Sequence, residues 1–112
     1  MLALTPATRM FVVAVAPLHL PRGFDGLCAH VQSVLEQQVV EGGLFVFTNR
    51  RRNRLRLLWF DGTGLWLATK RLEAGSLSWP RAEGVSVGLR PEQLSALMSG
   101  LEVQEKPGWY RR

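Results

Sequence analysis

A chain of 112 residues with 46% hydrophobic and 21% charged residues has the composition of one globular domain, which excludes a disordered or membrane-embedded chain. Its formal net charge of +5 favours acidic partners. The lone cysteine excludes an internal disulfide framework, no apolar run approaches the roughly 18 residues of a transmembrane helix, and no signal-peptide pattern is present, so we expect a cytoplasmic protein.

The first two predicted elements are a buried strand and an amphipathic helix. Residues 10–16 are apolar and rich in β-branched side chains, which indicates a strand that ends at Pro17. From Phe24 onward, apolar residues recur at the spacing of a helix with one core-facing stripe. This pattern predicts a helix over residues 23–38, with a stop signal in the glycines of 41–43.

Three strands are predicted next, because the apolar residues change to a period of two. They lie at 44–49, 54–60 and 65–73, and the segments 49–53 and 61–64 have the composition of turns. Sequential strands joined by such turns predict an antiparallel meander.

The middle strand of this meander predicts which face of the sheet is buried, because its side chains alternate between two faces. The face expected to join the core holds Leu55, Leu57 and Trp59. The opposite face holds Arg54, Arg56, Leu58 and Phe60.

The end of the chain adds short elements. Residues 76–79 and 85–89 could form short edge strands, and 90–101 predict a short helix with proline at its first position. The fold class is therefore α+β: an antiparallel meander of three to five strands packed against one longer helix, with a short C-terminal helix. Residues 1–101 form this single domain, and 102–112 are predicted to be a flexible basic tail.

The excess positive charge of the chain lies in one short region. Between residues 50 and 71 there are seven basic residues and one acid, Asp61, whereas the rest of the chain has seven basic and eight acidic residues. The seven candidate phosphate-binding residues are Arg50, Arg51, Arg52, Arg54, Arg56, Lys70 and Arg71. Arginine forms charge-assisted and often bidentate hydrogen bonds with phosphate, which favours nucleic-acid contact. The alternative is a solvated turn whose arginines protect an edge strand from aggregation.

The remaining reactive residues do not form a convincing catalytic or metal site. His19 and His30 have no partner at ligand spacing, and Cys28 lies on the apolar stripe of the first helix, where a packed thiol is expected. Asp25 and Asp61 would suit a metal-dependent nuclease, but a helix start and a turn explain them better. We therefore predict no catalytic residue, metal, cofactor, small-molecule substrate or membrane association.

The tryptophans have both structural and functional interpretations. Aromatic rings beside arginines can stack on unpaired bases, but the position of Trp59 in line with Leu55 and Leu57 favours core packing. Trp79 and Trp109 are compatible with either role.

Four ordered segments carry a resemblance to a known family. They are LPRGFDGL at 20–27, LFVFTNRRRNRLRLLWFDGTGLWLATKRLEAG at 44–75, WPRAE at 79–83 and LRPEQLSALMSGL at 89–101. In order and spacing they resemble the small accessory proteins, called TnpB or Orf2, of the bacterial insertion-sequence family numbered sixty-six. These proteins are distinct from the large RNA-guided nucleases that are also called TnpB.

The resemblance implies a protein encoded beside a separate transposase that assists movement of the element. Three parts of the sequence depart from the family pattern, and one of them is Phe60, which stands where tryptophan is commoner. Residues 19–22 read His-Leu-Pro-Arg where the family usually has Asp-x-Arg-Lys or Asp-x-Arg-Arg, and Arg90 stands where Thr or Ser would cap the last helix.

The resulting hypothesis is a non-catalytic accessory factor of transposition in the bacterial cytoplasm, associated with the nucleoid. Its partners would be DNA at the element ends, held by the seven basic residues, and the element's transposase. The alternative is a protein-interaction adaptor whose basic hairpin docks on the transposase without binding DNA. A third possibility, a cryptic nuclease, would depend on Asp61.

Overall fold

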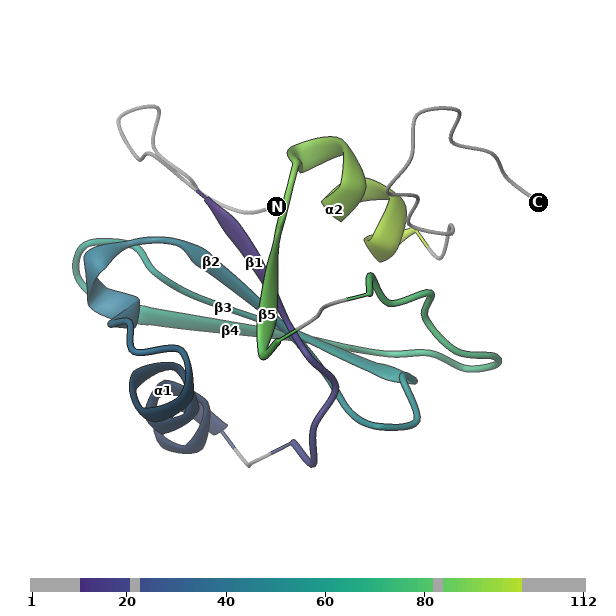
Figure 1. Cartoon of the computed structure of the whole chain (residues 1–112), viewed down its shortest axis with the longest axis horizontal. Coiled ribbons are helices and arrows are strands. Elements are labelled where there is room, and N and C mark those ends of the chain that lie inside the picture. The colour runs from purple at the N-terminus through teal and green to yellow at the C-terminus, as the bar shows by residue number, and fades with distance from the viewer. Residues whose placement is uncertain (1–10, 21–22, 82–83, 100–112) are drawn as a thin grey trace.

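The computed structural model describes residues 11–20, 23–81 and 84–99 (Figure 1). Predictions that concern Met10, Pro21, Arg22, Glu83, Leu101, Trp109 and the tail 102–112 lie outside the described residues. Within the described ranges the chain forms a five-stranded sheet in the order β4-β3-β2-β1-β5 and two α-helices. The predicted α+β class is therefore confirmed.

The predicted meander forms one half of the sheet. β2 (Leu44–Thr48), β3 (Arg54–Phe60) and β4 (Leu65–Arg71) pair in sequence as antiparallel neighbours. β3 has the predicted limits, whereas β4 ends two residues early. The Leu72 N–H still donates to the carbonyl of Asn53 at 2.9 Å, in register with the ladder, but the Asn53 N–H donates to Asn49 Oδ1 and returns no bond to Leu72.

The first strand makes the sheet mixed. β1 (Val12–Val15) lies between β2, to which it is parallel, and β5 (Ser86–Leu89), to which it is antiparallel. Parallel neighbours require a crossover connection, and α1 (Gly23–Val34) supplies it between β1 and β2. All four residues of β1 are buried, as the apolar run predicted.

Both faces of the sheet are covered. α1 and α2 (Pro91–Met98) lie on opposite sides of it in Figure 1. On one face Leu58, Phe45 and Phe47 pack against Leu27 and Val31 of α1. The second cluster contains Leu55, Leu57 and Trp59 together with Leu77, Leu89 and Leu97. The predicted core face of β3 is thus confirmed, but α2 and the 72–79 segment cover it, whereas α1 covers the face expected to be the outer one.

The first helix is shorter than predicted. α1 ends at Val34, four residues before the predicted limit of 38, because Glu36 has a φ of 58° that turns the chain out of the helix. The Gln37 N–H then donates to the carbonyl of Val31 at 3.2 Å. A short 3₁₀-helix, η1 (Val39–Glu41), follows and buries Val39 beside α1.

The prediction of a strand at residues 76–79 is wrong. The backbone there bonds outside the ladder, since the Leu77 N–H donates to the carbonyl of Arg52 at 2.6 Å. Leu77 is fully buried, and the indole N–H of Trp79 donates to the carbonyl of Val15 at 2.9 Å. The segment therefore fastens the 49–53 turn and β1 to the core, which gives Trp79 a structural role.

Candidate nucleic-acid interface

The basic turn between β2 and β3 faces the loop that follows β1 across an open groove of about 430 Å³. The groove is lined by His19, Leu20, Asn49, Arg51, Asn53, Arg54 and Arg56. Three of these residues are arginines and none is acidic. We name this site the arginine groove.

The backbone of the basic turn is held by one asparagine side chain. Asn49 Oδ1 accepts hydrogen bonds from the backbone N–H groups of Asn53 at 3.0 Å and Arg54 at 3.2 Å. The Asn49 side-chain amide donates to Asn53 Oδ1 at 2.7 Å, and the Thr48 hydroxyl donates to the Arg54 carbonyl at 2.7 Å. These local bonds explain why an arginine-rich segment forms a defined turn: asparagine stands at both of its ends.

Neighbouring segments fix the position of the turn. Arg52 has a φ of 58°, and its carbonyl accepts the Leu77 N–H. On the other side, the Leu18 N–H donates to the Thr48 carbonyl at 3.2 Å, which brings the loop with His19 to the end of β2. The arginine groove is therefore built between two segments far apart in sequence.

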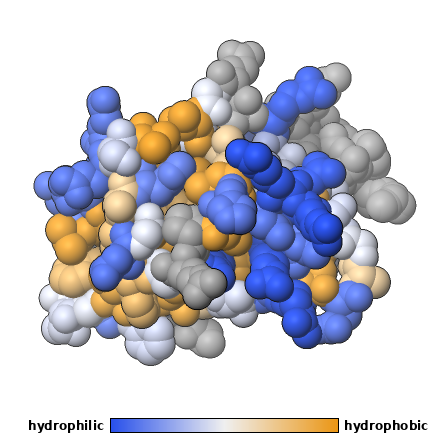
Figure 2. Space-filling model, turned by 90° about the horizontal axis from the view of Figure 1, so that it is seen from below, coloured by the Kyte–Doolittle hydropathy of each residue, from blue (hydrophilic) through white to orange (hydrophobic). Residues whose placement is uncertain are grey.

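The five arginines of the turn and β3 lie close together at one end of the sheet and differ in exposure. Arg50, Arg51, Arg52 and Arg54 are exposed, and Arg56 is half-buried. Arg54 and Arg56 lie two residues apart on the α1 face of β3, whereas Arg51 reaches the groove from the turn. Seen from below in Figure 2, strongly hydrophilic side chains gather at one end of the molecule, the end that holds the β2–β3 turn in Figure 1.

The structure does not bring Lys70 and Arg71 into the groove. Lys70 pairs with Leu55, so it lies on the α2 face, where its ammonium donates to the carbonyl of Met98 at 2.8 Å. Arg71 pairs with Arg54 on the α1 face but forms an ion pair with Glu73 at 3.7 Å. The seven predicted residues therefore divide into five arginines of the β2–β3 turn and β3, and two residues of β4 that lie outside the groove.

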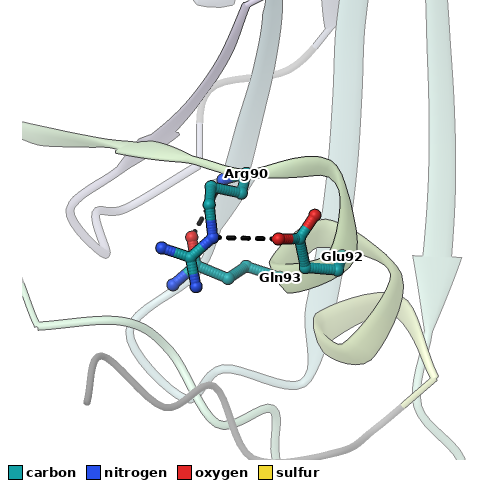
Figure 3. Close-up of polar contacts among 3 residues, drawn as sticks. All are labelled: Arg90, Glu92 and Gln93. Carbon is teal, nitrogen blue, oxygen red and sulfur yellow. Dashed lines mark hydrogen bonds and ion pairs between the residues drawn. The ribbon is translucent and has the colours of Figure 1, made fainter. Parts of the chain in front are cut away.

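Arg90 is a further exposed arginine with a local structural role (Figure 3). Its side chain does not cap α2; instead the Gln93 Oε1 accepts the Arg90 backbone N–H at 2.8 Å. The Arg90 Nε–H donates to Glu92 Oε2 at 3.0 Å. Gln93 thus supplies half of a capping box and replaces part of what a Thr or Ser cap would do.

Sequence reasoning missed four of the residues that line the groove: His19, Leu20, Asn49 and Asn53. Residues 19–22 depart from the family pattern, which drew attention to the loop after β1. Nothing in the sequence showed that this loop lies opposite the arginines. Asparagines stand on either side of the arginine run, and this pattern could have predicted that their side chains hold the turn by hydrogen bonds.

The carboxylate proposed for a nuclease has a structural role. Asp61 Oδ1 accepts hydrogen bonds from the backbone N–H groups of Thr63 and Gly64, both at 2.9 Å, and Oδ2 accepts the indole N–H of Trp66 at 2.7 Å. Gly62, with a φ of 106°, completes the predicted β3–β4 turn. Within the described ranges, no group of three His, Cys, Asp or Glu residues could hold a metal ion.

The hydrogen bonds to Asp61 predict an acid-dependent loss of stability. Those from the Thr63 backbone, the Trp66 indole and the Gly64 backbone lower the pKa of Asp61 from 3.8 to about 2. The ionised Asp61 carboxylate therefore stabilises the fold. This stabilisation is complete above the pKa of Asp61 in the unfolded chain and disappears as the pH falls from about 4 through about 2. We expect Asp61→Asn to unfold at lower urea concentration than wild type at pH 7, with the difference narrowing towards pH 2. A difference that does not change with pH would contradict this role.

The other reactive side chains are parts of the α1-side core. Burial and the neighbouring Asp25 charge raise the pKa of Cys28, as suits a packed thiol. Burial lowers the pKa of His30, whose ring meets Phe47 edge-on with centroids 6.4 Å apart. Trp59 belongs to the core cluster on the α2 side and stacks on Trp66 with ring centroids 5.7 Å apart.

Comparison with known proteins finds one family model and two similar proteins. A family model described as IS66 Orf2 like protein matches residues 9–107. Two proteins of Sinorhizobium fredii, both named as uncharacterized, are similar to the chain. The protein y4jC is 38% identical over 99 residues, which cover 86% of this chain and 85% of y4jC. The protein y4hO is 45% identical over 80 residues, which cover 71% of this chain and 70% of y4hO.

The other comparisons add two facts. No solved structure matches the chain significantly. In the part of the chain that the structure describes, no helix is both long enough and apolar enough to cross a membrane.

Proposed function

Because the chain belongs to the IS66 Orf2-like family, whose members are transposition-associated accessory proteins, we propose that it assists transposition by holding DNA phosphates in and around the arginine groove. The observation that carries the proposal is the groove itself, which gathers Arg51, Arg54 and Arg56 and has no carboxylate among the described residues that line it. The protein acts without catalysis, and its DNA target is the ends of the element.

The proposed contacts are electrostatic. A guanidinium can donate two parallel hydrogen bonds to phosphate, and these bonds are stronger than neutral ones. Arg54 and Arg56 lie roughly 7 Å apart along β3, which allows them to contact different phosphates of one strand. Contacts of this kind fix position and affinity and read little base sequence. Choice of the element ends would therefore fall to the transposase.

The proposal predicts a steep salt dependence of DNA binding. The β2–β3 turn and β3 carry five arginines: Arg50, Arg51, Arg52, Arg54 and Arg56. If all five contact phosphate, the slope of log affinity against log salt is about −4 to −5 for duplex DNA. Fluorescence anisotropy titrations at several salt concentrations measure it. Undetectable or salt-independent binding would contradict the proposal.

A second candidate function is docking on the transposase, and an apolar surface on the α2 face favours it. Trp66 is 50% exposed there. An open groove of about 190 Å³ beside α2 is lined by Leu55, Leu57, Ala68 and Met98, among others. A pull-down with purified transposase, with and without nuclease treatment, separates the functions: an association that survives nuclease does not depend on DNA.

A further inference from the structure

The arginine groove has a second wall that a phosphate alone does not require. This second wall lies opposite the arginines and has a different chemistry. From these two features we infer that the arginine groove holds one unpaired nucleotide of single-stranded DNA. The phosphates on either side of this nucleotide bind Arg51, Arg54 and Arg56, and its base lies against His19 and Leu20. This inference rests on the proposed function and names the form of DNA that the groove takes.

The two walls of the groove differ in chemistry. The β2–β3 turn and β3 provide guanidinium groups, whereas the loop after β1 provides the imidazole ring of His19 and the aliphatic side chain of Leu20. Leu20 is half-buried and packs against the α1-side core, so its position is fixed, while His19 is exposed. A nucleotide has the same two parts: a charged phosphate and a flat base with apolar faces.

A polar donor between the walls suits the edge of a base. Because Asn53 Oδ1 accepts from Asn49, the side-chain nitrogen of Asn53 remains a donor, and within the described residues it has no hydrogen-bond partner. Asn53 lines the groove. Its amide can therefore donate to a ring nitrogen or carbonyl of the base, which in a duplex would be engaged in pairing.

The groove is large enough to take one nucleotide. Its volume of about 430 Å³ lies within the range of about 300–1,000 Å³ typical of small-ligand sites. A base reaches a wall of this kind only when it is outside the stack, and a base that is already unpaired has no unstacking cost. The groove therefore selects single strands, such as those exposed while the ends of an element are opened.

The experiment compares one labelled oligothymidine with the same strand annealed to its complement, by fluorescence anisotropy at a single salt concentration. We expect wild type to bind the single strand about tenfold more tightly than the duplex. Leu20→Asn removes the apolar contact with the base and should lower single-strand affinity about tenfold, while duplex affinity stays within twofold. The matched control is Val40→Asn, which removes an exposed apolar side chain outside the groove and should change neither affinity.

Since Leu20 also contacts the core, His19→Ala provides a second test that removes only an exposed ring. Its circular dichroism should equal that of wild type while its single-strand affinity falls. Equal affinity for both forms of DNA, or equal weakening of both by these substitutions, overturns the inference and leaves the proposed function intact. Binding of neither form at low salt overturns both.

Discussion

Replacing Arg51, Arg54 and Arg56 together by alanine is expected to lower duplex affinity about 100- to 1,000-fold in roughly 0.1 M salt. Each phosphate contact contributes about 0.9 to the slope of log affinity against log salt, and the electrostatic advantage disappears near 1 M. Three contacts therefore amount to roughly 2.7 logarithmic units at 0.1 M. The salt slope itself should become shallower by nearly three. Anisotropy titrations of wild type and variant at matched salt measure both quantities.

The matched control removes the same amount of charge elsewhere. Lys70, Arg81 and Arg90 are exposed cations that do not line the arginine groove. Replacing these three by alanine should change affinity by less than about tenfold, since none of them lines the groove and salt weakens the effect of charges that do not contact phosphate. Equal losses in the two triple variants would mean that net charge determines binding, and the assignment of the groove would be wrong.

Leu58→Ala is expected to lower the free energy of unfolding by about 2–5 kcal/mol, the usual cost of removing a buried leucine side chain. Leu58 is fully buried at the centre of β3, between Phe45 of β2 and Leu67 of β4 and within the cluster that packs on α1. Alanine would leave a cavity where the sheet and helix meet. Urea unfolding followed by circular dichroism measures the loss.

Val40→Ala serves as the comparison for this prediction. Val40 is 56% exposed, so its truncation should change the free energy of unfolding by less than about 0.5 kcal/mol. A loss at Leu58 no larger than that at Val40 would show that the interior of the domain differs from the one described. Below its unfolding transition, Leu58→Ala should still bind DNA, since Leu58 lies outside the arginine groove.

Local sequence signals predicted the meander because its strands pair with their immediate neighbours. The period of two and the turn residues at 49–53 and 61–64 act over a few positions, and the limits of β3 followed from them. The position of β1 depends on contacts with Leu44 and Leu89, which no local pattern encodes. For the same reason, the amphipathic stripe predicted that α1 would be buried but not which face of the sheet it would cover.

The candidate site was predictable in its charge and not in its shape. Counting residues placed seven cations in one region, and five of them cluster as arginines of the turn and β3. The separation of Lys70 from Arg54 follows from strand pairing, which puts Lys70 opposite Leu55 on the other face. The wall formed by His19 and Leu20 depends on how the loop after β1 returns past the end of β2, a tertiary relationship.

The mixed sheet also separates early and late steps in synthesis of the chain. β2, β3 and β4 can pair as soon as they emerge, whereas β1, although made first, gains its second neighbour only when β5 has been translated. Short-range pairings form faster than long-range ones because they close smaller loops. The turn that bears the arginines therefore belongs to the part of the sheet expected to assemble first. Its opposing wall, attached to β1, would reach its final place later, so the groove would be completed only after β5 has joined the sheet.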